Sequence, residues 1–164
     1  MPKHLGHHSD VLNLVQDALG MDEGRVENFL RLHLVYDGDA TAASAELGIS
    51  ANALRASSRE VITLAQIIRV ALKATDDDRS IVAAVASVPS AIGRHAPAYL
   101  GAAQRVGGVT AVDAHALAKV TGSPFNTVRQ HWARLRELSR AAAWTFEYQG
   151  RPAMDHDQLF PGGL

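Results

Sequence analysis

Two pairs of side chains in this sequence carry the same chemistry: Asn52 with Arg55, and Asn126 with Arg129. An asparagine amide donates and accepts hydrogen bonds side by side, and an arginine guanidinium presents a planar fork of donors. These groups match the hydrogen-bonding edges of adenine and guanine in the major groove of DNA. We therefore expect each pair to lie on the exposed face of a helix.

The elements that must position the second pair lie in segment 112–136, which reads as two helices broken by a turn. Gly122 can adopt positive φ and end a short helix, Ser123 can cap the next helix, and Pro124 suits its first position. The apolar residues expected on the buried side of the second helix are Val128, Trp132 and Leu135. The residues expected on its opposite, exposed side are Phe125, Asn126, Arg129, Gln130 and Ala133. This order of elements is typical of a helix-turn-helix.

An earlier segment, 39–60, has a similar order. Asp39 or Thr41 can cap a short helix, Gly48 can turn the chain, and Ser50 can cap the following helix. With Leu54 and Val61 directed inward, the residues expected to face outward are Ala51, Asn52, Arg55, Ser58 and Arg59. The two segments share a plan, but too few identities to identify an internal repeat.

A helix that is apolar nearly all round continues from Arg59 to Leu72, and such a helix is expected to be buried. We predict an all-α protein in which this helix joins two domains, residues 1–74 and 75–164. The aspartates 76–78 after it are expected to cap the next helix rather than to bind a metal.

The C-terminal segment leaves two alternatives open. Residues 143–148 alternate and are β-prone, Gln149 and Gly150 can turn the chain, and residues 151–154 can return. This pattern would give a small β-hairpin wing beside the second helix-turn-helix. The alternative is an irregular tail that packs Trp144 and Phe146.

The composition fits helix packing through small side chains, because about one residue in six is alanine and only nine are aromatic. The 164 residues contain no cysteine, which excludes disulfides and cysteine-bound zinc. His4, His7 and His8 are interpreted as part of a solvated N-terminal tail, so we expect no metal or cofactor. No apolar run approaches a membrane span and the N-terminus does not resemble a secretory signal, so a cytoplasmic location is expected.

The formal net charge of -1 is unusual for a DNA-binding protein, but the charges are unevenly distributed. Residues 1–48 carry three basic and eight acidic groups, whereas residues 49–74 carry four and one, and residues 121–151 carry five and two. Positive charge therefore gathers around the two predicted reading helices. The arginines expected to contact phosphates are Arg59, Arg134, Arg136, Arg140 and Arg151.

An enzyme is a weaker interpretation. The chain has eight histidines and many carboxylates, but no H-E-x-x-H, no G-x-S-x-G and no glycine loop that could cradle a phosphate. We therefore expect double-stranded DNA as the partner and no catalysis.

The arrangement at residues 39–60 and 110–140, together with the chain length, resembles the immunity repressors of temperate actinobacterial phages, in particular those of the cluster A mycobacteriophages. The resemblance implies that an N-terminal helix-turn-helix and a C-terminal DNA-binding domain grip a short asymmetric site and keep lytic genes silent in the lysogen. It also implies a bacterial host cytoplasm. Asn52 and Arg55 would then belong to the first contact surface, and Asn126 and Arg129 to the second.

Two unlike reading helices in one polypeptide favour an asymmetric site bound by a monomer, since the chain has no heptad tail or separate dimerisation domain. Three alternatives remain open. The chain could be a dimeric helix-turn-helix regulator, a sigma-like or recombination accessory factor, or a protein-interaction module that does not bind DNA.

Overall fold

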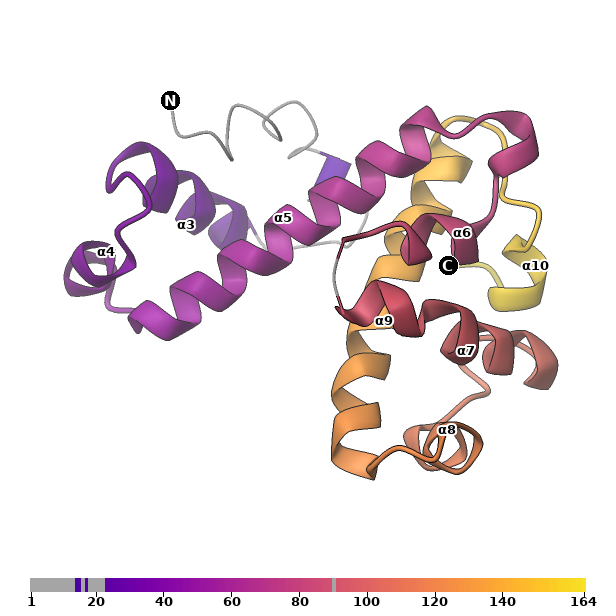
Figure 1. Ribbon diagram of the computed structural model, residues 1–164. Helices are drawn as coiled ribbons and strands as arrows, with labels where there is room; N and C mark the ends of the chain where they lie inside the picture. The colour runs from indigo at the N-terminus through magenta and orange to yellow at the C-terminus, as the bar shows by residue number, and fades with distance from the viewer. Residues whose placement is uncertain (1–13, 16, 18–22, 90) are drawn as a thin grey trace. The chain divides into compact units, whose positions relative to one another are not determined.

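The computed structural model describes residues 14, 15, 17, 23–89 and 91–164, and these residues are mostly helical (Figure 1). No strand occurs among them, which agrees with the expected all-α class. The chain divides into two compact units, Met1–Ile68 and Arg69–Leu164. Each unit is described separately below.

Unit 1 contains α3 (Glu23–Leu34), α4 (Ala40–Leu47) and most of α5 (Ala51–Lys73). Leu32, Ala40, Ala43 and Leu54 form one buried cluster that joins the three helices. Burial continues along α5 at helical spacing, at Val61, Leu64, Ala65, Ile67 and Ile68. These buried residues recur at helical spacing and so lie on one side of α5.

Helix α5 is one continuous helix of 23 residues, as the run from Arg59 to Leu72 predicted. The division between the units falls within it, after Ile68. The sequence placed the boundary at residue 74, just past the last residue of α5.

Unit 2 contains the end of α5, the 3₁₀ helix η2 (Asp76–Asp78), α6 (Ile81–Ala86), α7 (Ala91–Val106), α8 (Ala114–Thr121), α9 (Phe125–Tyr148) and α10 (His156–Leu159). Helices α6 and α7 pack on each other and on α9, and α8 packs against both α7 and α9. The largest fully buried side chains of this core include Tyr99, Leu100, Leu117, Leu135, Leu138 and Phe146. Helices α7 and α9 are thus the two elements on which the other helices of unit 2 pack.

The start of α6 is capped differently from the prediction. The Ser80 hydroxyl accepts a hydrogen bond from the Ala83 amide at 3.2 Å. The Asp155 carboxylate accepts from the amides of Ile81 and Val82, at 2.8 and 3.1 Å. The three aspartates 76–78 instead form η2 and are exposed. A carboxylate distant in sequence therefore satisfies the helix N-terminus and fixes the C-terminal segment to α6.

The C-terminal wing is absent from the described residues, and the alternative of an irregular tail over 143–148 is also wrong. Helix α9 continues to Tyr148, and the chain turns at Gln149 and Gly150 without forming a strand on either side. Thr145 and Phe146 are both fully buried in the helical conformation. Burial of this helical face outweighs the β-propensity of the individual residues.

Candidate nucleic-acid interface

Helix α4, which precedes the first Asn–Arg pair, is defined by a cap at each end. The Asp39 carboxylate accepts hydrogen bonds from the amides of Thr41 and Ala42, both at 3.1 Å. At the other end Gly48 adopts φ 69° and donates its amide to the Ser44 carbonyl at 3.1 Å. Since this left-handed conformation is disfavoured for residues with a Cβ, Gly48 ends α4 and redirects the chain.

Helix α8, which precedes the second pair, has the same two caps. Asp113 accepts from the Ala116 amide at 2.7 Å, and Gly122 adopts φ 68° and donates to the Ala118 carbonyl at 2.9 Å. Each of these short helices is eight residues long and is followed by three residues before the next helix begins.

The start of α5 agrees with the sequence prediction. The Ser50 hydroxyl accepts a hydrogen bond from the Ala53 amide at 3.1 Å and thereby caps the helix. Leu54 is buried and Asn52 is exposed, as predicted. The predicted outward position of Ala51 is wrong, because its side chain is half-buried against the unit 1 core.

Arg55 lies exposed between two oxygen acceptors. Its guanidinium donates to Asn52 Oδ1 at 3.2 Å and to Thr41 Oγ1 on α4 at 3.5 Å. These contacts orient the guanidinium across the gap between α4 and α5. We define the first candidate surface as Ser50, Asn52, Arg55 and the exposed Arg59.

Ser58 does not belong to this surface, and its predicted outward position is wrong. Ser58 is 7% exposed, and its hydroxyl lies 2.8 Å from Nε2 of the buried His33 on α3. Residue 58 falls four residues after Leu54 and three before Val61, which places it on the buried stripe. The spacing carried this information, but the serine side chain suggested a polar environment.

The exposed side of the N-terminal half of α9 forms the second candidate surface. Val128, Trp132 and Leu135 are buried, as predicted. The exposed residues that define the surface are Phe125, Asn126, Arg129, Gln130 and Arg136.

Phe125 is 36% exposed and stacks on the ring of His115, with 4.1 Å between ring centroids and an interplanar angle of 14°. His115 is exposed on the first turn of α8 and is not among the contact residues predicted from the sequence. Its position two residues after the cap Asp113 is the signal that could have identified it. The stacked rings of Phe125 and His115 give the second surface an aromatic patch, which the first surface lacks.

Ser123 does not cap α9. The residue before the helix is Pro124, which adopts an extended conformation and makes no side-chain cap hydrogen bond. Ser123 is half-buried in the turn. The α9 start therefore depends on the fixed φ of Pro124 rather than on a hydroxyl.

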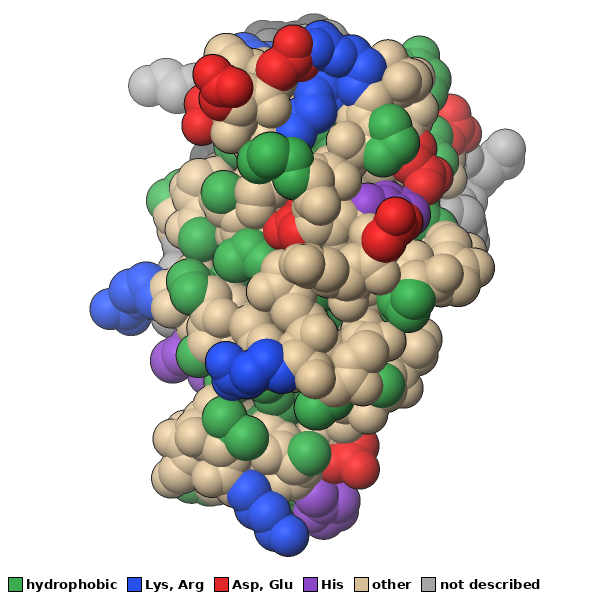
Figure 2. Space-filling view, turned by 90° about the vertical axis from the view of Figure 1, so that its right-hand side faces the viewer, with side chains coloured by type: hydrophobic (Ala, Val, Ile, Leu, Met, Phe, Trp, Pro, Cys, Tyr) green, Lys and Arg blue, Asp and Glu red, His purple; other side chains and the backbone are tan. Residues whose placement is uncertain are grey.

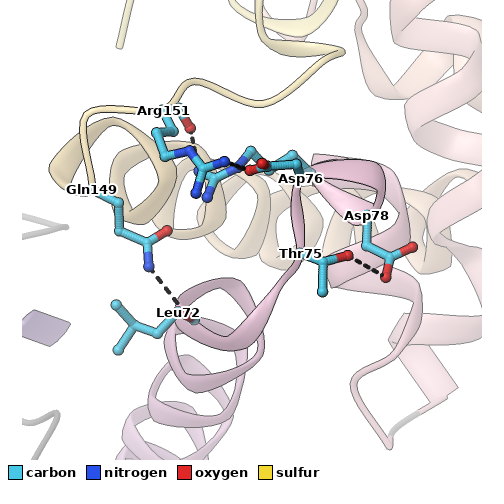
Figure 3. A network of polar contacts seen from close by, with 7 residues as sticks. Leu72, Thr75, Asp76, Asp78, Gln149 and Arg151 are labelled. Atoms are coloured by element: carbon cyan, nitrogen blue, oxygen red, sulfur yellow. Dashed lines mark hydrogen bonds and ion pairs between the residues drawn. The ribbon is translucent and has the colours of Figure 1, made fainter.

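Arg134 and Arg151 are engaged by carboxylates, although the sequence assigned both to phosphates. Arg134 lies 3.9 Å from Glu137 on α9. Arg151 forms an ion pair with Asp76, and its carbonyl accepts a hydrogen bond from Arg79 at 2.6 Å (Figure 3). Asp76 also lies 3.6 Å from Nε of Arg79, so this one carboxylate pairs with both arginines within unit 2.

His131 of α9 packs into unit 2 rather than forming part of the exposed surface. Its ring stacks on His95 of α7 with 4.8 Å between centroids, and Tyr99 lies beside both. Desolvation by burial, and secondarily the neighbouring His95, lower the pKa of His131 below its ordinary value. The neutral ring is therefore the form that this packing favours.

Figure 2 shows one face of the molecule, on which the Lys and Arg side chains of the described residues form no continuous band. Polar and hydrophobic groups separate them. This face does not offer an extended positive track for a phosphate backbone.

No model of a protein family, no curated protein and no solved structure matches this chain. Within the described residues, no three His, Asp or Glu side chains lie close enough together to hold a metal ion. His4, His7 and His8 lie outside the described residues. None of the described helices is both long and apolar enough to cross a membrane.

Proposed function

We propose that this chain is a sequence-specific repressor of transcription that binds double-stranded DNA through two helix-turn-helix units. The first unit comprises α4 and the start of α5, and the second comprises α8 and the start of α9. In each unit the short helix and its glycine turn position the following helix for entry into the major groove.

One observation carries the proposal. Asn52 with Arg55, and Asn126 with Arg129, are exposed in the first two turns of long helices whose opposite faces are buried. Amide and guanidinium groups at these positions can form bidentate hydrogen bonds with adenine and guanine.

The resemblance to phage immunity repressors gives the proposal its biological form. The chain would hold lytic promoters silent in a lysogen, in the cytoplasm of a bacterial host. It would bind a short asymmetric operator as a monomer, because the two surfaces differ in their flanking residues.

The experiment is selection of bound duplexes from a random pool by the purified full chain, followed by footprinting and sedimentation of the complex. We expect a short asymmetric site occupied by one chain. A symmetric site occupied by two chains would instead indicate a dimeric regulator. A requirement for polymerase or recombinase would indicate an accessory factor, and no salt-dependent DNA binding would indicate a protein-interaction module.

A further inference from the structure

Equivalent residues of the two candidate units are separated by a constant 74 residues in the sequence. Asp113 follows Asp39 by 74 residues, Gly122 follows Gly48 by 74, and the first residue of α9 follows the first residue of α5 by 74. The aspartate cap of the short helix and the left-handed glycine thus occur in the same register in both units, whereas the Ser50 cap of α5 is replaced by Pro124 at the start of α9.

The buried residues of the two long helices keep this offset. The pairs that are buried in both helices are Leu54 and Val128, Ser58 and Trp132, Val61 and Leu135, Leu64 and Leu138, Ala65 and Ser139, Ile67 and Ala141, Ile68 and Ala142, and Ala71 and Thr145. Most of these pairs differ in residue type, so the register is visible in the structure although the sequence hides it.

Among the exposed residues at the start of the two long helices, sequence identity is confined to two positions. When residues 51–60 are aligned with 125–134, only two positions carry the same residue, namely Asn52 with Asn126 and Arg55 with Arg129. All four are exposed. Neither a cap nor the core requires these types at these positions, and the Arg55–Asn52 hydrogen bond is the local contact that the first pair makes.

We infer that the two units read the same short base element, so that the DNA target contains two copies of it. This inference rests on the proposed function. In each copy the asparagine pairs with adenine and the arginine with guanine. Side chains three apart on a helix lie about 5–6 Å apart, so the two bases lie within about two steps of the duplex, at about 3.4 Å a step.

The bases that flank the two copies differ, because the neighbouring side chains differ. Beside its pair the second unit carries the Phe125–His115 stack and Gln130. The first unit carries Thr41 and Ala56 at the positions equivalent to His115 and Gln130. The Phe125 ring can contact a thymine methyl group. The equivalent residue of the first unit, Ala51, has a side chain too short to make the same contact. The complete site therefore remains asymmetric around a shared element.

The first test is selection of duplexes from a random pool by the full chain. We expect the bound sequences to contain one adenine- and guanine-containing element twice. Bound sequences that share a consensus with no repeated element would overturn this inference and leave the proposed function standing. Failure to enrich any sequence would overturn both.

The second test uses paired variants on the selected duplex, N52A/R55A and N126A/R129A. Each should lose roughly 5- to 100-fold in affinity, and each should become insensitive to base changes in one copy while remaining sensitive to the same changes in the other. Circular dichroism checks that these exposed substitutions leave the fold intact. Variants that lose sensitivity to different bases would show that the two units read unrelated elements. R59A is the control, since loss of a phosphate contact weakens all duplexes alike.

Discussion

At the scale of single residues, Arg55 illustrates how hydrogen bonds within the folded unit order an exposed side chain. Asn52 and Thr41 hold its guanidinium in place without burying it. Part of the side-chain entropy that a base contact would cost is therefore lost on folding rather than on binding.

The exposed pairs were predictable from sequence because the buried positions between them are apolar and helically spaced. Ser58 and Ser123 were not, since a hydroxyl fits a cap, a surface and a buried hydrogen bond equally well. What decides for Ser58 is its neighbour His33, which is 25 residues away in the chain and comes close only in the folded unit.

Replacement of Ser58 by alanine is expected to reduce the free energy of unfolding by about 1–2 kcal/mol, because it removes a buried hydrogen bond to His33. Denaturant unfolding measures this loss. DNA affinity at temperatures where the variant is folded should not change. A variant of unchanged stability with weakened binding would return Ser58 to the contact surface.

The stacked pair His131 and His95 predicts a dependence of stability on pH. Because folding lowers the pKa of His131 below 6.5, the unfolded chain binds more protons in the range just below that value. Stability should therefore be fully present above about pH 6.5 and decline as the pH falls. Thermal unfolding from pH 7 to pH 5 should show a smaller decline for His131→Gln than for the parent chain. Equal declines would exclude this origin.

At the scale of elements, the short helix, the turn and the long helix were predictable because glycine and aspartate have strong positional preferences at helix ends. The end of α9 was not. Trp144 and Tyr148 stack at 5.1 Å between centroids, four residues apart, which is a helical contact that the alternating sequence conceals. The buried alanines 141–143 extend the helix into this segment.

Substitution of Gly122 tests the turn between α8 and α9, which orients the helix that carries the second surface. At Gly122 a Cβ would meet no neighbouring atom, so the cost of Gly122→Ala comes from the left-handed backbone alone. We expect a loss of about 1–2 kcal/mol in unfolding free energy, and a smaller loss for Gly122→Asn, which tolerates this conformation better. Calorimetry of both variants measures the difference. Equal losses would mean that something other than φ limits residue 122.

At the scale of the whole molecule, some arginines are exposed and others are paired with carboxylates. The chain has a formal net charge of -1, and Arg134 and Arg151 are paired with carboxylates. Arg59 and Arg136 are exposed on α5 and α9. We therefore expect few phosphate contacts and a shallow dependence of affinity on salt.

Arg136 and Arg151 form a matched comparison for this expectation. Replacing Arg136 by alanine should weaken binding to all sequences alike and reduce the slope of log affinity against log salt by about one. Replacing Arg151 should leave that slope unchanged, because Asp76 already pairs with it. Fluorescence anisotropy across a salt series provides both slopes. A reduced slope for the Arg151 variant alone would reverse the assignment of the phosphate contact.

The claim that α5 and α9 present two DNA-reading surfaces is tested most directly by one competition titration. A duplex selected by the full chain and a scrambled duplex of equal length compete for the protein at a fixed, physiological salt concentration. The predicted result is a preference of about 1000-fold or more for the selected duplex, which falls sharply in the N126A/R129A variant. Equal affinity for both duplexes, or no binding to either, would contradict the claim.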